Sequence, residues 1–121
     1  MSRFVVLLHQ TPAGYARGTH LDLMLEKEGI LLTWAIAELP TIDNSVLAER
    51  LADHRLTYLD YEGPILGGRG SVERIDRGEF GWLETTPRRY VALVTGEKLR
   101  GRLVLEQDDA EPQRWRVVLS D

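Results

Sequence analysis

The stretch Thr19–Glu26, THLDLMLE, alternates between leucines and other side chains. A period of two predicts a β-strand, and it directs Leu21, Leu23 and Leu25 toward a hydrophobic core. The opposite face of this strand carries four chemically varied side chains: His20, Asp22, Met24 and Glu26. The His20 imidazole and the Asp22 carboxylate point the same way, roughly 6–7 Å apart along the strand. One cation is within reach of both groups, so the pair predicts a functional site.

Apolar segments before and after this strand continue the β-pattern. Arg3–His9 is an unbroken apolar run, typical of a buried strand that ends at its histidine. A loop containing glycine and proline separates this run from the THLDLMLE strand. After that strand, a Glu-Gly pair allows a tight turn into Ile30–Ala37, so His20–Ala37 is predicted to form a hairpin.

The middle of the chain contains one segment with a different spacing. Ser45–Asp53, SVLAERLAD, has apolar residues at short helical intervals, and Asp43 or Asn44 can cap its first turn. This segment is therefore predicted to be a short α-helix. The remaining strands are expected to be short, and the first two of them to turn at Gly78. They are predicted at Ser71–Arg77, Glu79–Leu83, Arg89–Thr95, Leu99–Glu106 and Arg114–Leu119.

This pattern of about eight short strands and one short helix indicates a mainly β protein, because strands and helices do not alternate regularly. A small antiparallel β-barrel is the expected architecture, since closure leaves no exposed sheet edge in a small β domain. The three tryptophans fall in predicted strands and are expected in the core, although an exposed one would suit stacking on a base. They are Trp34, Trp82 and Trp115.

The composition is that of an ordinary globular domain. With 121 residues, 43% apolar and 28% charged, the chain fits a single domain, residues 1–121, around one modest core. Its apolar runs are too short for a membrane helix or a signal peptide, which favours a cytoplasmic protein without a membrane partner. The absence of cysteine excludes disulfides, thiol catalysis and cysteine-type zinc sites.

The charge pattern limits the kind of nucleic-acid contact. A net charge of −4 argues against a broad, non-specific nucleic-acid binder but leaves room for a local basic patch. All basic residues except Lys27 and Lys98 are arginines. That preference suits bidentate phosphate contacts, or it reflects the codon usage of a GC-rich genome.

The histidines are candidates for metal binding. His9 ends a strand that is able to pair beside His20, which would bring two imidazoles and Asp22 around one cation. A set of two histidines and one carboxylate leaves positions open for water and substrate, and it favours Mn²⁺ or Zn²⁺. Glu26, on the same face, is either a carboxylate that orients a metal-bound imidazole or a charge at the end of a hairpin.

Two further features are candidates for phosphate binding. Tyr58 follows His54 by four residues, so a helical turn would let both side chains hold one anion, unless the tyrosine packs a barrel end with Tyr61. The loop Gly67–Gly70 offers backbone N–H groups and Arg69 to a phosphate, or it is a mobile hairpin tip. No serine lies in a nucleophile motif, so hydrolysis would depend on a metal ion.

These residues, in this order, resemble the 3′-phosphoesterase module of bacterial DNA ligase D and its stand-alone relatives. That family's pattern starts with a histidine at the end of a strand and continues with a His-x-Asp-x-Arg-x-Glu strand. Ser-Trp-Ala, Asp-His-Pro-Leu-x-Tyr and a late Gly-Glu-x-Leu-x-Gly follow. The corresponding segments here are His9, His20–Glu26, Thr33–Ala35, Asp53–Tyr58 and Gly96–Gly101.

The resemblance implies a small β-barrel with a surface groove and a Mn²⁺-dependent activity on the 3′ ends of nucleic acids in DNA repair. Such an enzyme removes a terminal ribonucleoside and then the remaining 3′-phosphate, which leaves a 3′-hydroxyl. By position, His9, His20 and Asp22 would hold the metal. His54 and Tyr58 would hold the scissile phosphate, with His54 able to protonate the leaving oxygen. The implied partners are a primer-template of DNA or RNA and a separate ligase or polymerase, at the nucleoid in the cytoplasm.

The chain departs from the family pattern at two places. Met24 stands where the family has an arginine that contacts phosphate, and the segment between the first two histidines is longer and includes Arg17. Loss of a charge-assisted arginine contact costs about 1.5–3 kcal/mol. Arg17 or Arg69 is expected to supply a replacement cation. The alternatives are a metal-containing module that binds nucleic-acid ends without turnover and a phosphoesterase for small molecules, which the net negative charge would suit.

Overall fold

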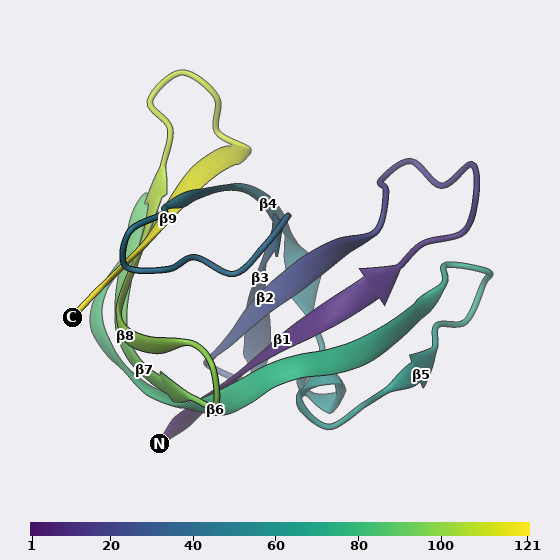
Figure 1. Cartoon of the computed structure of the whole chain (residues 1–121), viewed down its shortest axis with the longest axis horizontal. Coiled ribbons are helices and arrows are strands. Elements are labelled where there is room, and N and C mark those ends of the chain that lie inside the picture. The colour runs from purple at the N-terminus through teal and green to yellow at the C-terminus, as the bar shows by residue number, and fades with distance from the viewer.

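The protein consists almost entirely of antiparallel strands in a computed structural model that covers residues 1–121 (Figure 1). The only helical element is the 3₁₀ turn η1 (Leu56–Leu59), and no helix has the length and apolarity needed to cross a membrane. The strands are β1 (Ser2–Gln10), β2 (His20–Lys27), β3 (Ile30–Ile36), β4 (Val46–His54), β5 (Gly63–Pro64), β6 (Ser71–Thr86), β7 (Arg89–Gly96), β8 (Arg100–Gln107) and β9 (Arg114–Ser120).

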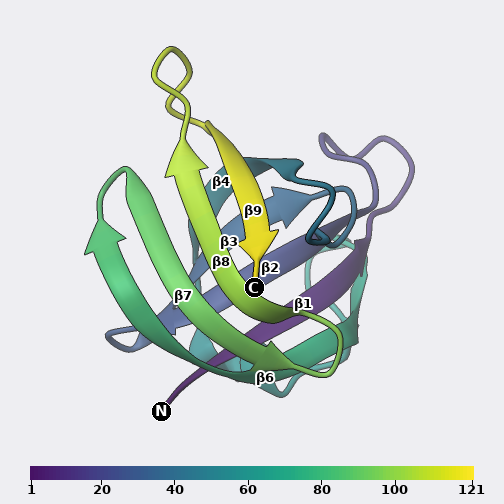
Figure 2. The ribbon, with the colours of Figure 1, turned by 60° about the vertical axis from the view of Figure 1, so that its left-hand side comes forward.

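Eight of these strands close into a barrel, as predicted (Figure 2). The strand order is β1-β2-β3-β4-β9-β8-β7-β6, and β6 pairs back onto β1 to complete the ring. The two-residue β5 pairs only with the start of β6, outside this ring. All eight wall strands therefore have a neighbour on each side, and the barrel exposes no free edge.

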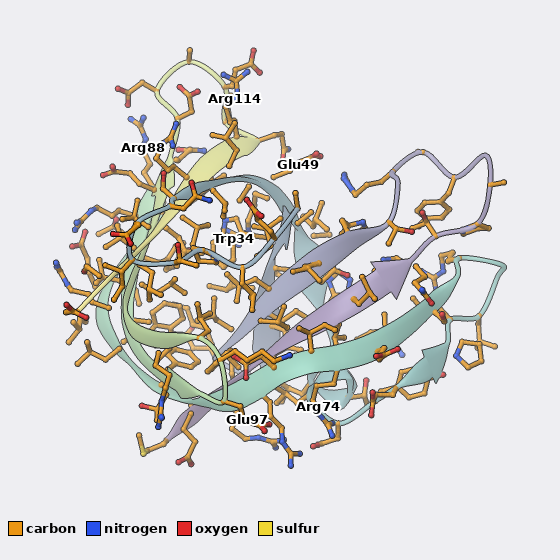
Figure 3. The ribbon with its side chains drawn as sticks, viewed as in Figure 1. Trp34, Glu49, Arg74, Arg88, Glu97 and Arg114 are labelled. Carbon is orange, nitrogen blue, oxygen red and sulfur yellow. The ribbon has the colours of Figure 1, made fainter.

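The barrel interior is filled by alternate residues of the wall strands. Leu23 and Leu25 of β2 are fully buried there, together with Trp34 of β3 (Figure 3) and Trp115 of β9. Trp82 packs against the same cluster while remaining partly exposed. The predicted leucine face of the THLDLMLE strand and the predicted core positions of the tryptophans are confirmed.

A second, smaller apolar cluster lies on the outer face of β1 and β2. It is covered by the segment that runs from η1 through β5 (Figure 1). Asp22 and Met24 on this face are only 2% and 1% exposed. Its fully buried apolar members are Val5, Leu7, Met24, Leu31, Leu59 and Val72. The face of the THLDLMLE strand that carries Asp22 and Met24 therefore lies beneath the η1–β5 segment.

The prediction of a helix at Ser45–Asp53 is wrong, because this segment forms strand β4. Val46 and Ala48 are buried in the core while Leu47 and Glu49 are exposed, which is the period of a strand. The strand pairs with β3 on one side and β9 on the other. Without it the barrel would stay open between those two strands, so the tertiary pairing outweighs the weak local helical spacing.

The prediction of a turn at Gly78 is also wrong, because β6 continues through Gly78 as one strand of 16 residues. The first part of this strand pairs with β1 and the last part with β7. A Cβ atom at Gly78 would lie 2.1 Å from the carbonyl oxygen of Thr95. The glycine therefore permits a close approach of β6 to β7 rather than a reversal of the chain.

A buried carboxylate holds the turn between β7 and β8. Asp76 is 1% exposed and accepts hydrogen bonds from the backbone N–H groups of Glu97 (2.8 Å), Lys98 (3.1 Å) and Leu99 (2.7 Å). A Cβ atom at Gly96 would lie 2.6 Å from the same carboxylate. The Gly-Glu-x-Leu-x-Gly segment is therefore a structural turn built around Asp76.

Candidate active site

The pairing of β1 with β2 brings the predicted metal ligands together. His9 lies directly opposite His20 in the register of the two strands, and their ring centroids are 5.0 Å apart. Asp22 follows on the same face of β2. The candidate ligand atoms of the three residues all lie within 4.8 Å of one another. This separation allows two imidazole nitrogens and one carboxylate oxygen to contact a single ion.

Backbone carbonyls orient both imidazoles. Nε2 of His9 donates to the carbonyl oxygen of Arg69 at 2.8 Å, and Nδ1 of His20 donates to that of Gly18 at 2.7 Å. The second nitrogen of each ring, Nδ1 of His9 and Nε2 of His20, faces the carboxylate of Asp22 at 3.5 Å and 2.9 Å. The shorter contact is a hydrogen bond between Nε2 of His20 and Asp22. A bound ion would replace the proton on Nε2, and the main-chain carbonyls would keep both rings oriented as ligands.

The electrostatics of this cluster favour a positive charge. Burial acts to lower the pKa of His20, but the hydrogen bonds with Asp22 and Gly18 and the charge of Asp22 outweigh burial, so the pKa is raised. Arg17 acts weakly in the opposite direction. The nearly buried carboxylate therefore stabilises a proton on His20, and a bound cation would take that proton's place. The donor set and the charge both fit a divalent ion.

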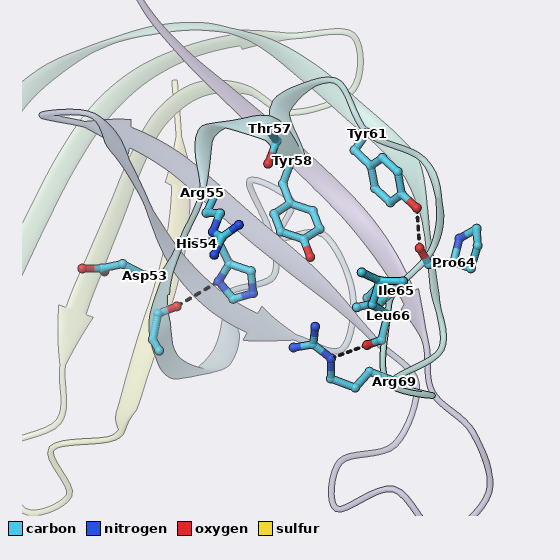
Figure 4. A pocket seen from close by; sticks show the side chains of 11 residues that line it. Asp53, His54, Arg55, Thr57, Tyr58, Tyr61, Pro64, Ile65, Leu66 and Arg69 are labelled. Atoms are coloured by element: carbon cyan, nitrogen blue, oxygen red, sulfur yellow. Dashed lines mark hydrogen bonds between the residues drawn. The ribbon is translucent and has the colours of Figure 1, made fainter.

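The predicted phosphate residues lie across the groove from this cluster. His54 ends β4, and the helical turn η1 places Tyr58 beside it with the ring centroids 5.5 Å apart. Nδ1 of His54 donates to the carbonyl oxygen of Ala52 at 2.9 Å, which leaves Nε2 as the free nitrogen (Figure 4). The turn thus gives the two side chains the common face that the four-residue spacing predicts.

Arg69 reaches the same groove from the β5–β6 loop. Its Nε donates to the carbonyl oxygen of Leu66 at 2.9 Å, and the guanidinium group extends toward His54 (Figure 4). Gly70 has a φ of +94°, and a Cβ atom there would lie 1.9 Å from the carbonyl oxygen of Gln10. Only glycine lets the loop pass so close over the end of β1, and this passage brings the Arg69 carbonyl to His9.

Two adjoining hollows connect the candidate metal ligands His9, His20 and Asp22, called the metal cluster below, to the candidate phosphate-binding residues His54, Tyr58 and Arg69. A small cavity of about 80 Å³ is lined by residues of both groups, among them His9, Asp22, Met24, His54, Tyr58 and Arg69. A wider pocket of about 710 Å³ shares His54, Tyr58, Ile65 and Arg69 with it. The buried side chain of Met24 therefore lies between the metal cluster and the phosphate residues.

The structure does not bring two other predicted residues into this groove. Arg17 forms a two-point ion pair with Glu49, at 2.7 Å and 3.3 Å, on the far side of His20. The carboxylate of Glu26 accepts the backbone N–H of Arg3 at 2.9 Å, whereas the imidazoles are oriented by main-chain carbonyls. Sequence patterns do not identify these carbonyls, because every residue carries one.

The chain matches the family described as the DNA ligase D 3′-phosphoesterase domain over residues 11–107. It belongs to that family. His9 lies just before the matched range, and His20, Asp22, His54 and Tyr58 lie within it. The resemblance of the sequence motifs is thereby confirmed.

Its relatives include large repair proteins. The chain is 38% identical over 112 residues to the multifunctional non-homologous end joining protein LigD of Pseudomonas aeruginosa, covering 82% of this chain and 13% of that protein. It is 30% identical over 121 residues to the corresponding protein of Mycolicibacterium smegmatis, covering 87% of this chain and 15% of the relative. The chain thus spans only about a seventh of the length of these relatives.

Proposed function

We propose that this protein is a metal-dependent phosphoesterase that processes the 3′ ends of nucleic acids in DNA repair. It would remove a 3′-terminal ribonucleoside and then the remaining 3′-phosphate, leaving a 3′-hydroxyl. The observation that carries this proposal is the cavity that His9 and Asp22 of the candidate metal site line together with His54 and Tyr58. Membership of the family and the repair role named for its relatives support it.

Three residues would hold the metal, with Mn²⁺ as the first candidate and Zn²⁺ as the second. The ligand atoms would be Nδ1 of His9, Nε2 of His20 and a carboxylate oxygen of Asp22, because the bonds to main-chain carbonyls occupy the other nitrogen of each ring. A bound ion would replace the hydrogen bond between Nε2 of His20 and Asp22. A divalent ion in such a site supplies Lewis acidity, which makes water a stronger nucleophile and offsets charge on a phosphoryl oxygen.

The remaining residues would bind the phosphate and move one proton. The oxygen of water would bond to phosphorus while the bond from phosphorus to the leaving oxygen breaks, and one proton of that water would pass to the solvent. The leaving oxygen would take a proton from Nε2 of His54, which would regain a proton from the solvent before the next turnover. The Tyr58 hydroxyl donates a hydrogen bond to a phosphoryl oxygen, and the Arg69 guanidinium neutralises its charge. We assign this cation to Arg69 because Arg17 is already paired with Glu49.

The second candidate function is a binding module that retains the metal and recognises nucleic-acid ends without turnover. The buried thioether of Met24 in the cavity favours it, because an arginine at that point would contact phosphate directly. In that case the groove would bind a 3′ end more weakly and leave it unchanged.

One assay separates the two candidates. The purified protein is incubated with Mn²⁺ and a primer-template that ends in a 3′-ribonucleotide or a 3′-phosphate, in parallel with His20→Ala and the control Arg88→Ala. Arg88 is exposed and lies in the turn between β6 and β7. Product formed by the wild type and the control but not by His20→Ala supports the enzyme. Binding of the end without product supports the binding module.

A further inference from the structure

We propose that the wide pocket beside His54 is the subsite for the leaving nucleoside, with the base held between Tyr61 and Leu66. This inference rests on the proposed function and adds where the released half of the substrate is bound. The pocket of about 710 Å³ is bounded by the end of β4, η1 and the β5–β6 loop (Figure 4).

The position of His54 fixes the side on which the leaving group lies. The residue that protonates the leaving oxygen must be within hydrogen-bond reach of it. His54 lines both the small cavity of the metal cluster and the wide pocket, so a nucleoside that departs past its ring enters the wide pocket. The hollow of about 540 Å³ near Arg17 lies on the other side of His20 and does not include His54. The geometry therefore assigns the leaving nucleoside to the wide pocket.

The size and aromatic lining of the pocket suit a base and a sugar. Its volume falls in the range of about 300–1,000 Å³ that is typical of small-molecule sites. Tyr58 and Tyr61 meet edge to face with centroids 6.1 Å apart. Aromatic rings of this kind bind any base by stacking. Thr57 and Asp53, which also line the pocket, offer polar groups for sugar hydroxyls.

Tyr61 is held in place before any ligand arrives. Its hydroxyl donates to the carbonyl oxygen of Pro64 (Figure 4), so both ends of the side chain are fixed. Gly63 has a φ of +135°, and a Cβ atom there would lie 3.2 Å from the Tyr61 hydroxyl. The backbone thus leaves room for this ring, which remains 38% exposed. A fixed, half-exposed ring loses little conformational entropy when a base stacks on it.

Leu66 completes the subsite at its rim. The side chain is 87% exposed and is part of neither apolar cluster, so it contributes little to folding. A large apolar side chain at the edge of a polar groove gains from covering an apolar ligand surface. The face of a nucleobase is such a surface, and Leu66 is placed to cover it.

The two reactions of the proposed enzyme provide the test. The leaving oxygen is the 5′-oxygen of the ribonucleoside in the first reaction and the 3′-oxygen of the primer's last nucleoside in the second, so both reactions place a nucleoside on the leaving side. A 3′-phosphate primer whose last sugar lacks a base therefore provides the contrast. Substitutions in this subsite should slow ribonucleoside removal but not the removal of a 3′-phosphate from such an abasic end. We expect Tyr61→Ala and Leu66→Asp to lower kcat/KM for a 3′-ribonucleotide primer about 5-fold to 100-fold, the effect of losing a base contact. The ratio of this rate to the rate for a 3′-phosphate primer with an abasic end should fall with it. Tyr61→Phe keeps the ring and should retain the wild-type ratio.

Two further measurements complete the design. Free adenosine should inhibit the wild-type protein competitively, and it should no longer inhibit the Leu66→Asp variant. Residue 66 is so exposed that this substitution should not disturb folding. Leu93→Ala, which alters another exposed leucine on β7, is the matched control. An unchanged rate ratio in Tyr61→Ala and Leu66→Asp, in a wild type active on both primers, would overturn the subsite alone. A wild type inactive on both primers would overturn the proposed function and the subsite together.

Discussion

At the scale of single residues, Arg69 has two roles in this site. Its backbone carbonyl fixes the ring of His9, and its guanidinium group extends toward His54 in the cavity that Met24 also lines. The main-chain role survives substitution, whereas the side-chain role does not. Arg69 therefore allows phosphate binding to be weakened without loss of the metal cluster.

We expect Arg69→Ala to lower kcat/KM about 10-fold to 150-fold, which corresponds to the loss of a charge-assisted contact of about 1.5–3 kcal/mol. The Mn²⁺ affinity, measured by isothermal titration calorimetry, should stay close to that of the wild type because the carbonyl is retained. Arg17→Ala tests the rival cation in the same assay. If neither substitution changes kcat/KM, no replacement for the arginine missing at Met24 exists in these loops.

The raised pKa of His20 determines how metal affinity should depend on pH. A metal ligand must be unprotonated, so the Mn²⁺ affinity should fall as the pH drops through the raised pKa, which lies above 6.5. In the metal-free protein, the stability that His20 contributes changes with pH in the opposite direction. The stabilising contribution of protonated His20 is fully present below its unfolded-state pKa and is lost as the pH rises through its folded-state value.

The measurement is a calorimetric titration with Mn²⁺ between pH 6 and pH 8, with proton release followed in two buffers of different ionisation enthalpy. If the number of protons released on Mn²⁺ binding were the same at all pH values, the assignment of His20 as a ligand would be contradicted. A direct NMR titration of the His20 ring in the metal-free protein gives the midpoint independently.

At the scale of elements, the turn between β7 and β8 depends on one carboxylate. Asp76→Ala would leave the backbone N–H groups of Glu97, Lys98 and Leu99 without their acceptor. An unpaired buried donor costs about 1–3 kcal/mol, which applies in full to the buried bond of Leu99, whereas the partly buried bonds of Glu97 and Lys98 are expected at the lower end, about 1 kcal/mol each. We therefore expect a total destabilisation of about 3–5 kcal/mol. Urea unfolding measures this change, and Glu73→Ala, on an exposed part of the same strand, is the control. A loss below about 1 kcal/mol would mean that water replaces the carboxylate.

The sequence predicts strands well where a period of two or an unbroken apolar run defines a long buried face. The THLDLMLE strand meets the first condition and β1 the second, and their pairing also places His9 beside His20. The segment of β4 does not meet it, because its few apolar residues fit a helix or a strand equally. Its conformation is decided by β3 and β9, and β9 is distant in the sequence. Long-range pairing of this kind cannot be read from local spacing.

The candidate site, like the fold, is only partly predictable from the sequence. The side chains that supply nitrogen and oxygen ligands are visible in the sequence, and the structure gathers them as the strand faces predict. The main-chain carbonyls of Gly18 and Arg69 are not visible, since their position depends on how two loops fold back over the barrel. The steric requirement at Gly70 is equally hidden, because it arises from the backbone of Gln10.

At the scale of the whole molecule, the site lies between a closed barrel and a segment that crosses its outer face. The candidate metal ligands belong to β1 and β2, which are paired with neighbours on both sides. The candidate phosphate-binding residues belong to the end of β4, η1 and the loop after β5, and β5 is paired through only two residues. The candidate metal ligands are therefore fixed by the barrel, whereas the candidate phosphate-binding residues depend on the crossing segment.

This arrangement predicts that metal binding stabilises the entire fold. An ion held by His9 of β1 and by two residues of β2 links adjacent wall strands, and the unfolded chain has no such site. At a free Mn²⁺ concentration 100 times the Kd, the stabilisation is about 2.7 kcal/mol, which corresponds to a rise in Tm of roughly 10 °C. Thermal unfolding with and without Mn²⁺ measures it. His20→Ala should show no Mn²⁺-dependent rise in Tm, whereas Tyr58→Phe, which alters only the crossing segment, should show the full one. Equal behaviour of these two variants would place the bound ion elsewhere on the barrel.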